Sequence, residues 1–123
     1  MKVLGPSNIN KQGKTAEKDA CHFLTHNGYK IIKHNYKVKG GEIDIIAIKN
    51  NIVHFIEVKS RLGQFCEVSE VVRPAQLNRI ITTSQKFLQN SQYQNHDFQY
   101  DFMFIAVQNN QTTIELCENV TLF

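Results

Sequence analysis

The amino-acid sequence predicts one α/β domain in which two helices flank a central mixed β-sheet, with the element order αβββαββ. Three observations carry this prediction: two amphipathic stretches of helical length, two apolar runs joined by an Asn-Asn turn, and a second such pair near the C-terminus. A chain of 123 residues has the length of a single domain with a buried core. We expect this domain to span residues 13–123, behind an extended or mobile N-terminal arm at 1–12 that contains Gly5 and Pro6.

Both helices are predicted from apolar spacing and from terminal signals. The first should run from about Thr15 to His26, because its apolar residues share one stripe and Asn27-Gly28 is a stop signal. The second should begin at Pro74, a residue that suits the first position of a helix. Loops are expected at 60–73 and 89–99.

The strands are predicted from runs of β-branched and aromatic residues. A first strand is expected over 29–38, followed by a hairpin of Glu42–Ile48 and Val53–Lys59 around Asn50-Asn51. A second hairpin, 102–107 with 112–117, should turn at Asn109-Asn110. These two hairpins supply four of the five predicted strands.

The first hairpin brings charged residues together. If its two asparagines are the loop residues, counting outward sets Asp44 opposite Glu57 and puts Lys59 on the same face. Opposed side chains have Cβ atoms roughly 4.5–5.5 Å apart, and like charges so placed repel. A hard cation such as Mg²⁺, held by carboxylates and water, would relieve this repulsion. The alternative is a solvated face on which Lys59 is only a counter-ion to Glu42 and Glu57.

Two motifs occupy this hairpin: Gly41-Glu42-Ile43-Asp44 and Phe55-Ile56-Glu57-Val58-Lys59-Ser60-Arg61. In them the sequence resembles the UPF0102 (YraN-like) family, which belongs to the PD-(D/E)xK, or restriction-endonuclease-like, superfamily. The resemblance covers nearly all of residues 13–123. It implies a restriction-endonuclease-like fold and a Mg²⁺- or Mn²⁺-dependent endonuclease that acts on nucleic acid, with DNA processing or repair as the expected role.

The resemblance also implies roles for individual residues. The implied metal ligands are Asp44, Glu57, Glu17 and the backbone carbonyl of Val58. Lys59 would be the catalytic lysine, and Gln76 would hydrogen-bond the phosphate or a water. For Glu17, a favourable charge in the first turn of its helix is an equal alternative. Relatives typically carry a lysine where this chain has Gln76. A catalytically inactive module of the same fold is therefore an alternative.

Six basic residues are candidates for contacts with nucleic-acid phosphates: Lys30, Lys33, Lys37, Arg61, Arg73 and Arg79. Such contacts are independent of sequence and sensitive to salt. For any single one of these residues, a role in solubility is the favoured alternative. The net charge of +3 is compatible with a DNA partner but does not demand one.

Composition sets further expectations. No stretch approaches the ~20 apolar residues that cross a bilayer, and Met1 to Lys14 lacks a signal-peptide core. The cysteines at 21, 66 and 117 are widely spaced, so we expect reduced thiols in a cytoplasmic protein. His54 should point away from Asp44.

Two rivals to the nuclease remain: an inactive nucleic-acid-binding module and an adaptor whose acidic face binds a basic protein. The sequence leaves a homodimer possible and does not distinguish DNA from RNA.

Overall fold

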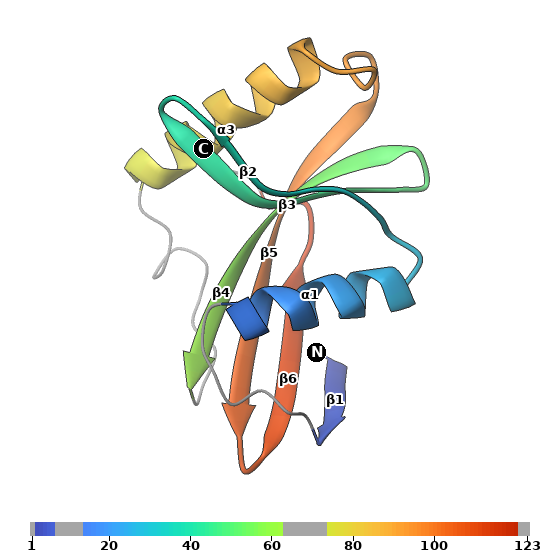
Figure 1. Ribbon diagram of the computed structural model, residues 1–123, viewed down its shortest axis with the longest axis vertical. Helices are drawn as coiled ribbons and strands as arrows, with labels where there is room; N and C mark the ends of the chain where they lie inside the picture. Colours follow the sequence, from blue (N-terminus) through green and yellow to red (C-terminus); the bar gives the residue numbers. More distant parts are fainter. Residues whose placement is uncertain (1, 7–13, 63–73, 121–123) are drawn as a thin grey trace.

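The computed structural model describes residues 2–6, 14–62 and 74–120. The strands are β1 (Lys2–Pro6), β2 (Lys30–Val38), β3 (Gly41–Lys49), β4 (Ile52–Leu62), β5 (Asp97–Gln108) and β6 (Gln111–Cys117), and the helices are α1 (Lys14–His26) and α3 (Pro74–Gln89). The strands form one sheet in the order β1-β6-β5-β4-β3-β2 (Figure 1). Residues 1 and 7–12 of the predicted arm and 63–73 of the predicted loop, with Cys66 and Arg73, lie outside this description, as do residues 13 and 121–123.

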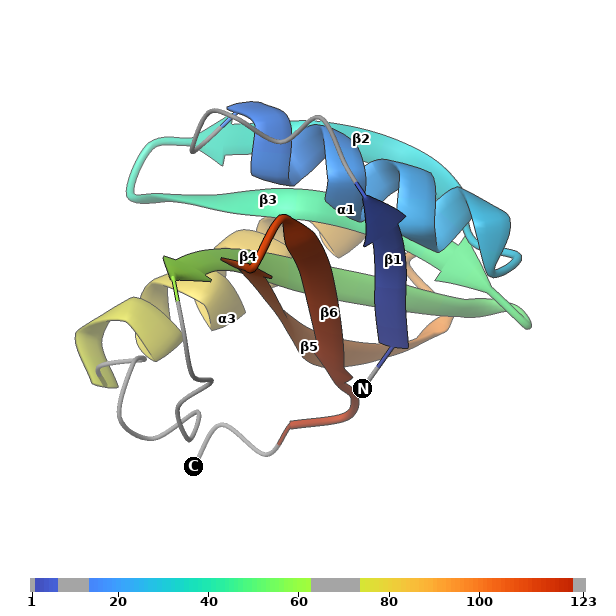
Figure 2. The same ribbon diagram turned by 90° about the horizontal axis from the view of Figure 1, so that it is seen from below.

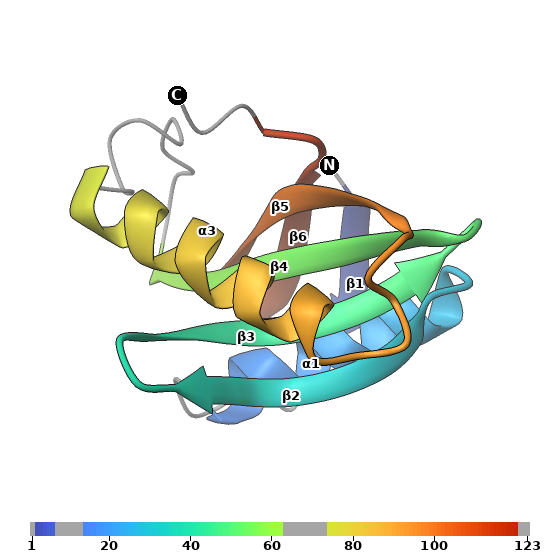
Figure 3. The same cartoon turned by 90° about the horizontal axis from the view of Figure 1, so that it is seen from above.

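The sheet is mixed, as predicted. Strands β4 and β5 run parallel, and every other neighbouring pair is antiparallel. Helix α1 lies on one face of the sheet (Figure 2), and helix α3 lies on the opposite face, seen from the other side in Figure 3. The prediction of an α/β fold is therefore confirmed, and the architecture is compatible with a restriction-endonuclease-like fold.

Both helices and both hairpins form where the sequence predicted them. The turn residues Asn50 and Asn51 have φ values of 52° and 64°, and Asn109 and Asn110 have 53° and 62°. Positive φ at both central residues is the conformation that asparagine tolerates and that matches the twist of a hairpin. The two-residue loop fixes the pairing by count, so Ile48 pairs with Val53 and Ile46 with Phe55, as expected.

Two parts of the sheet differ from the prediction. Strand β1 lies within the segment expected to be an extended or mobile arm, and it pairs with the edge strand β6, with Lys2 opposite Ile114. Strand β5 begins at Asp97 instead of near residue 102, which shortens the expected loop. The added residues Phe98 and Tyr100 pack their rings against Phe55, so they gain a tertiary contact that local composition does not reveal.

The buried core divides into the two faces of the sheet. On the side of α1, Leu24 packs with Ile45 and Ile56. On the side of α3, Phe87 packs with Ile46 and Phe55. The neighbours Phe55 and Ile56 therefore face opposite helices, as side chains of a strand alternate. The central strands are apolar on both faces because both are covered.

Besides the register shift in β2 between Ile31 and Lys33, the alternation in β2 and β3 breaks near Asp44. His34 contacts Cys21 of α1, whereas Tyr36, two residues later, packs against Phe87 of α3. Asn35 between them has a φ of 47°, and the β2–β3 ladder omits the pair that Asn35 would form with Asp44. Both strands therefore switch faces at this point, and Asp44 stands at the switch.

Candidate active site

Asp44 lies where β3 and β4 part. The last ladder pair is Ile45 with Ile56, and beyond it β4 runs away from the β2–β3 hairpin (Figure 1). In place of the next ladder bond, the Val58 N–H donates to Asp44 Oδ2 across 2.8 Å. The half-buried carboxylate of Asp44 thus bridges the two strands at the point where they part, which we call the fork.

Glu57 occupies the other side of the fork. Its side chain is buried, with 7% of the residue exposed, and the Asp44 N–H approaches its Oε1 at 3.4 Å. Burial, followed by the negative charge of Asp44, raises the pKa of Glu57 to about 8. Burial also raises the pKa of Asp44, although the Val58 hydrogen bond opposes the shift. The two carboxyl groups therefore resist being ionised together. The predicted ladder pair of Asp44 with Glu57 does not form, because the β3–β4 ladder ends at Ile45 with Ile56.

Lys59 is the positive group beside this pair. It lies two residues after Glu57 on β4 and is half-buried. Its charge lowers the pKa of both Asp44 and Glu57, which opposes the larger effect of burial. The ammonium group is therefore close enough to act on both carboxylates, as predicted, but it does not neutralise them.

A cleft of about 580 Å³ opens next to Glu57. Its lining comes from the β2–β3 turn, from β4 and from the first two turns of α3: Lys37, Val38, Gly40, Gly41, Glu42, Glu57, Gln76, Arg79 and Ile80. Of the predicted carboxylate and lysine site, only Glu57 lines the cleft, and Asp44 and Lys59 are not among its lining residues. The structure therefore brings Gln76 and Arg79 to the same space as Glu57.

The wall of this cleft depends on Gly41. A Cβ built at Gly41 would overlap the Thr83 hydroxyl and would lie 3.2 Å from the backbone oxygen of Arg79. The missing side chain lets α3 pack directly on the start of β3. Gly41 thus fixes the distance between the helix that carries Gln76 and the strand that carries Asp44, a role that the sequence analysis did not recognise.

Glu17 of α1 approaches the pair from the other face of the sheet. Its charge is one of the causes that raise the pKa of Asp44. Its Oε2 accepts a hydrogen bond from Asn35 Nδ2 at 3.3 Å. Asn35 is the residue at which β2 switches faces, so this contact links α1 to the irregularity beside Asp44. Glu17 had two alternative roles, a metal ligand or a favourable charge in the first helical turn. Its effect on the pKa of Asp44 places it near that residue.

The predicted phosphate-binding residues are dispersed. Lys30 and Lys33 are exposed on the edge strand β2. Lys37 lines the cleft, but its Nζ lies 4.0 Å from the carboxylate of Glu42, with both side chains more than half exposed. The side chain of Arg61 lies outside the described part of the structure. Among the predicted phosphate-binding residues whose side chains the structure describes, only Lys37 and Arg79 line the cleft.

The donors at the fork fit a hard divalent cation. Two carboxylates come from adjacent strands, the buried Glu57 and the half-buried Asp44. The negative charge of Asp44 makes ionisation of Glu57 less favourable. Oxygen ligands of this kind suit Mg²⁺ and Mn²⁺. Asp44 and Glu57 would hold such an ion. The carbonyl of Val58 stays a predicted ligand.

The fold and this site define an α/β protein with a two-carboxylate centre at the fork of a mixed sheet. The profile of "Uncharacterised protein family UPF0102" matches residues 16–107, and the chain belongs to that family. Neither helix in the described ranges has the length and apolar character of a membrane span.

Relatives in the same family cover most of the chain. A UPF0102 protein of Helicobacter pylori is 38% identical over 110 residues, which are 89% of this chain and 90% of that protein. One of Campylobacter jejuni is 41% identical over 110 residues, covering 89% and 92% respectively. A third, of Sulfurihydrogenibium sp., is 35% identical over 102 residues, covering 82% and 87%.

Proposed function

We propose that this protein is a Mg²⁺- or Mn²⁺-dependent nuclease that hydrolyses phosphodiester bonds, with DNA as the expected substrate. The observation that carries the proposal is the pair of Asp44 and Glu57 at the strand fork, beside Lys59 and at the edge of a cleft. Keeping two carboxylates together away from water is costly without a ligand. A carboxyl group whose pKa is strongly raised by burial and by a charged neighbour, and which lines a cleft, is a candidate for a functional site.

Each side chain of the site then has a distinct task. A cation bound by Asp44 and Glu57 would polarise a phosphate oxygen and lower the pKa of a coordinated water. Lys59 supplies positive charge where negative charge develops on the phosphate in the transition state. Gln76 has an amide group that both donates and accepts hydrogen bonds, and it would orient the scissile phosphate or the attacking water.

The approach of the substrate would rest on basic residues at and around the cleft. Arg79 can form two parallel hydrogen bonds with one phosphate, and Lys37 contributes charge at the opposite wall. Lys30 and Lys33 extend this positive charge along the edge strand β2. Contacts of this kind hold the backbone of a nucleic acid without reading its sequence.

The proposal is tested by calorimetric titration of Mn²⁺ into the wild-type protein and Asp44→Ala, with and without DNA. We expect binding by the wild type and its loss in the variant. Cleavage of single-stranded, duplex and branched DNA is then compared for wild type, Lys59→Ala and the control Lys18→Ala. Lys18 is exposed on α1, so its replacement removes the same charge far from the cleft.

The outcomes separate the three candidate functions. A nuclease loses cleavage in Lys59→Ala while retaining DNA affinity, and Lys18→Ala cleaves as the wild type does. An inactive module binds DNA in a salt-dependent way but never cleaves it. Absence of affinity for both DNA and RNA would contradict the proposal and favour an adaptor that binds a basic protein.

A further inference from the structure

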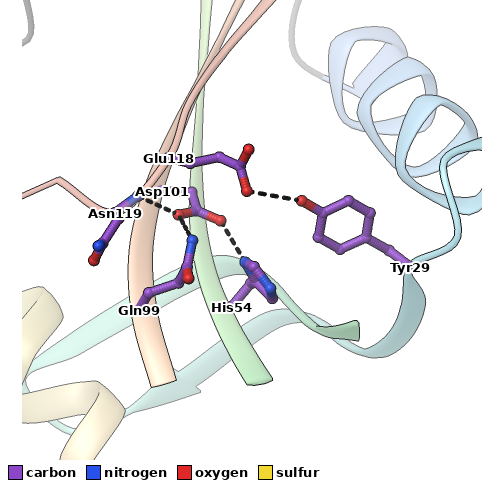
Figure 4. Close-up of polar contacts among 6 residues, drawn as sticks. All are labelled: Tyr29, His54, Gln99, Asp101, Glu118 and Asn119. Carbon is purple, nitrogen blue, oxygen red and sulfur yellow. Dashed lines mark hydrogen bonds and ion pairs between the residues drawn. The ribbon is translucent and has the colours of Figure 1, made fainter. Parts of the chain in front are cut away.

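A second polar cluster lies on the α1 side of the sheet, away from the cleft. His54 and Asp101 come from the adjacent strands β4 and β5, and only 4% and 1% of these residues are exposed. His54 Nδ1 lies 2.7 Å from Asp101 Oδ2 (Figure 4). His54 alternates with Phe55, which faces α3, so the imidazole faces away from the fork as the sequence predicted.

The carboxylate of Asp101 is held firmly by its neighbours. Its other oxygen, Oδ1, accepts hydrogen bonds from Gln99 Nε2 at 2.8 Å and from the backbone N–H of Asn119 at 2.9 Å. These two donors leave Oδ2 directed at His54 (Figure 4). An oriented carboxylate oxygen next to an imidazole nitrogen is a pair of potential metal ligands with a supporting second shell.

Glu118 completes a three-ligand group. One ligand atom from each of His54, Asp101 and Glu118 lies within 4.8 Å of the others. The Tyr29 hydroxyl donates to Glu118 Oε1 at 3.4 Å and so holds the carboxylate over the pair (Figure 4). Glu118 is exposed, and a cavity of about 170 Å³ reaches it past Tyr29 and Lys49. His54 and Asp101 do not line this cavity, so an ion would reach them only by passing Glu118.

We propose that His54, Asp101 and Glu118 bind a Zn²⁺ ion, at a site separate from the carboxylate fork. One imidazole and two carboxylates match the ligand types of zinc, whereas an imidazole ligand disfavours Mg²⁺. Three protein ligands leave a fourth tetrahedral position for water on the exposed side of Glu118. The ion would also offset the two negative charges that the cluster gathers.

Binding requires a small local adjustment. Two atoms that each lie 2.0–2.1 Å from a tetrahedral Zn²⁺ are roughly 3.3 Å apart, so Nδ1 and Oδ2 must separate by about half an ångström. The proton between them moves to Nε2 if the imidazole is neutral, because neutral histidine keeps one N–H. The movement falls to His54, whose ring packs edge-on against Tyr29, since Gln99 and Asn119 hold Asp101 in place.

The test is calorimetric titration of Zn²⁺ alone into Asp44→Ala protein, a background that disables the fork. We expect one site, weakened at least about tenfold by Glu118→Gln and abolished by His54→Gln. Because Glu118 is exposed and glutamine can still accept from Tyr29, Glu118→Gln should fold normally, so the result does not depend on the stability of His54→Gln. Visible absorption of a Co²⁺-loaded sample, present in the background and lost in Glu118→Gln, provides a second readout.

A matched control excludes adventitious binding. His22 and His26 stack one turn apart on the exposed side of α1 and could capture zinc on their own. The double variant His22→Gln/His26→Gln should leave the affinity unchanged. The proposal is overturned if the background does not bind Zn²⁺, if Glu118→Gln binds it equally well, or if the surface pair accounts for the binding. None of these outcomes bears on the nuclease proposal, because the fork is already disabled.

Discussion

The carboxylate of Asp44 accepts a hydrogen bond from the backbone N–H of Val58, on the neighbouring strand, at 2.8 Å. This side chain performs the task of a strand carbonyl at the place where the β3–β4 ladder has ended. The same carboxylate faces Glu57 and feels the charge of Glu17 on the opposite helix. Asp44 therefore has a structural role and an electrostatic role, and the two can be separated by mutation.

Asp44→Asn should retain the fold and lose the metal. The asparagine oxygen can still accept from Val58, while removal of the charge relieves the repulsion on Glu57. We expect the free energy of unfolding to equal or exceed that of the wild type, with Mn²⁺ binding abolished. Asp44→Ala instead leaves the Val58 N–H without its acceptor and should cost about 1–3 kcal/mol. Urea unfolding of both variants measures the difference, and equal stabilities would contradict the role of the hydrogen bond.

The raised pKa of Glu57 predicts how the stability of the metal-free protein depends on pH. The folded value of about 8 exceeds an unfolded value of about 4.3. The contribution of Glu57 to the free energy of unfolding is therefore fully present below its pKa in the unfolded state. This contribution is lost as the pH rises through its pKa in the folded state. Stability should fall across this window in the wild type and change less in Glu57→Gln, as measured by urea unfolding at several pH values.

The affinity for Mn²⁺ should have the opposite dependence on pH. Because the cation binds the ionised carboxylate, its affinity should rise with pH and level off once Glu57 has lost its proton, near pH 8. Calorimetry in buffers of different ionisation enthalpy would also report the proton released on binding. An affinity that is constant across this range would show that Glu57 is not a ligand.

Gly41→Ala should damage the cleft through the position of α3. The added methyl group overlaps the Thr83 hydroxyl, and overpacking of this kind typically costs about 1–3 kcal/mol. Thr83→Ala in the same chain removes the obstructing group, so the double variant should recover part of the loss. A double-mutant cycle on the free energy of unfolding measures this coupling. Additive effects would contradict the close packing of Gly41 on Thr83.

Arg79→Ala should weaken the binding of DNA without altering any preference for sequence. Loss of one phosphate contact is expected to reduce the slope of log affinity against log salt by about 1. Lys18→Ala is the control, because it removes one positive charge from the surface of α1. Fluorescence anisotropy at several salt concentrations distinguishes the two, and equal slopes would remove Arg79 from the interface.

The elements of this protein were predictable where a local signal fixes them. The two-residue turn at Asn50-Asn51 sets the register of β3 and β4 by counting alone, which is how the pairing of Ile46 with Phe55 could be foreseen. The boundaries of both helices follow from Pro74 and from Asn27-Gly28 in the same way.

What depends on distant contacts was not predictable. Lys2 pairs in the sheet with Ile114, near the other end of the chain. His54 forms a hydrogen bond with Asp101, which lies on a strand that follows α3 in the sequence. Strict alternation of side chains also fails at Asn35, whose left-handed backbone moves Tyr36 to the face of α3. Asparagine adopts that conformation without a distinctive sequence signal, so this switch of faces could not be predicted from the residues alone.

The parallel pairing of β4 with β5 has a consequence for the order of folding. Hairpins with two-residue loops form within microseconds, so β3 and β4, with Asp44 and Glu57 on them, can associate early. Ile52 meets Asp97 only after the intervening chain, α3 included, has closed a long loop, and such closure is slow. We expect the acidic side of the cleft to assemble first, and the wall that carries Gln76 and Arg79 to dock in a later kinetic step.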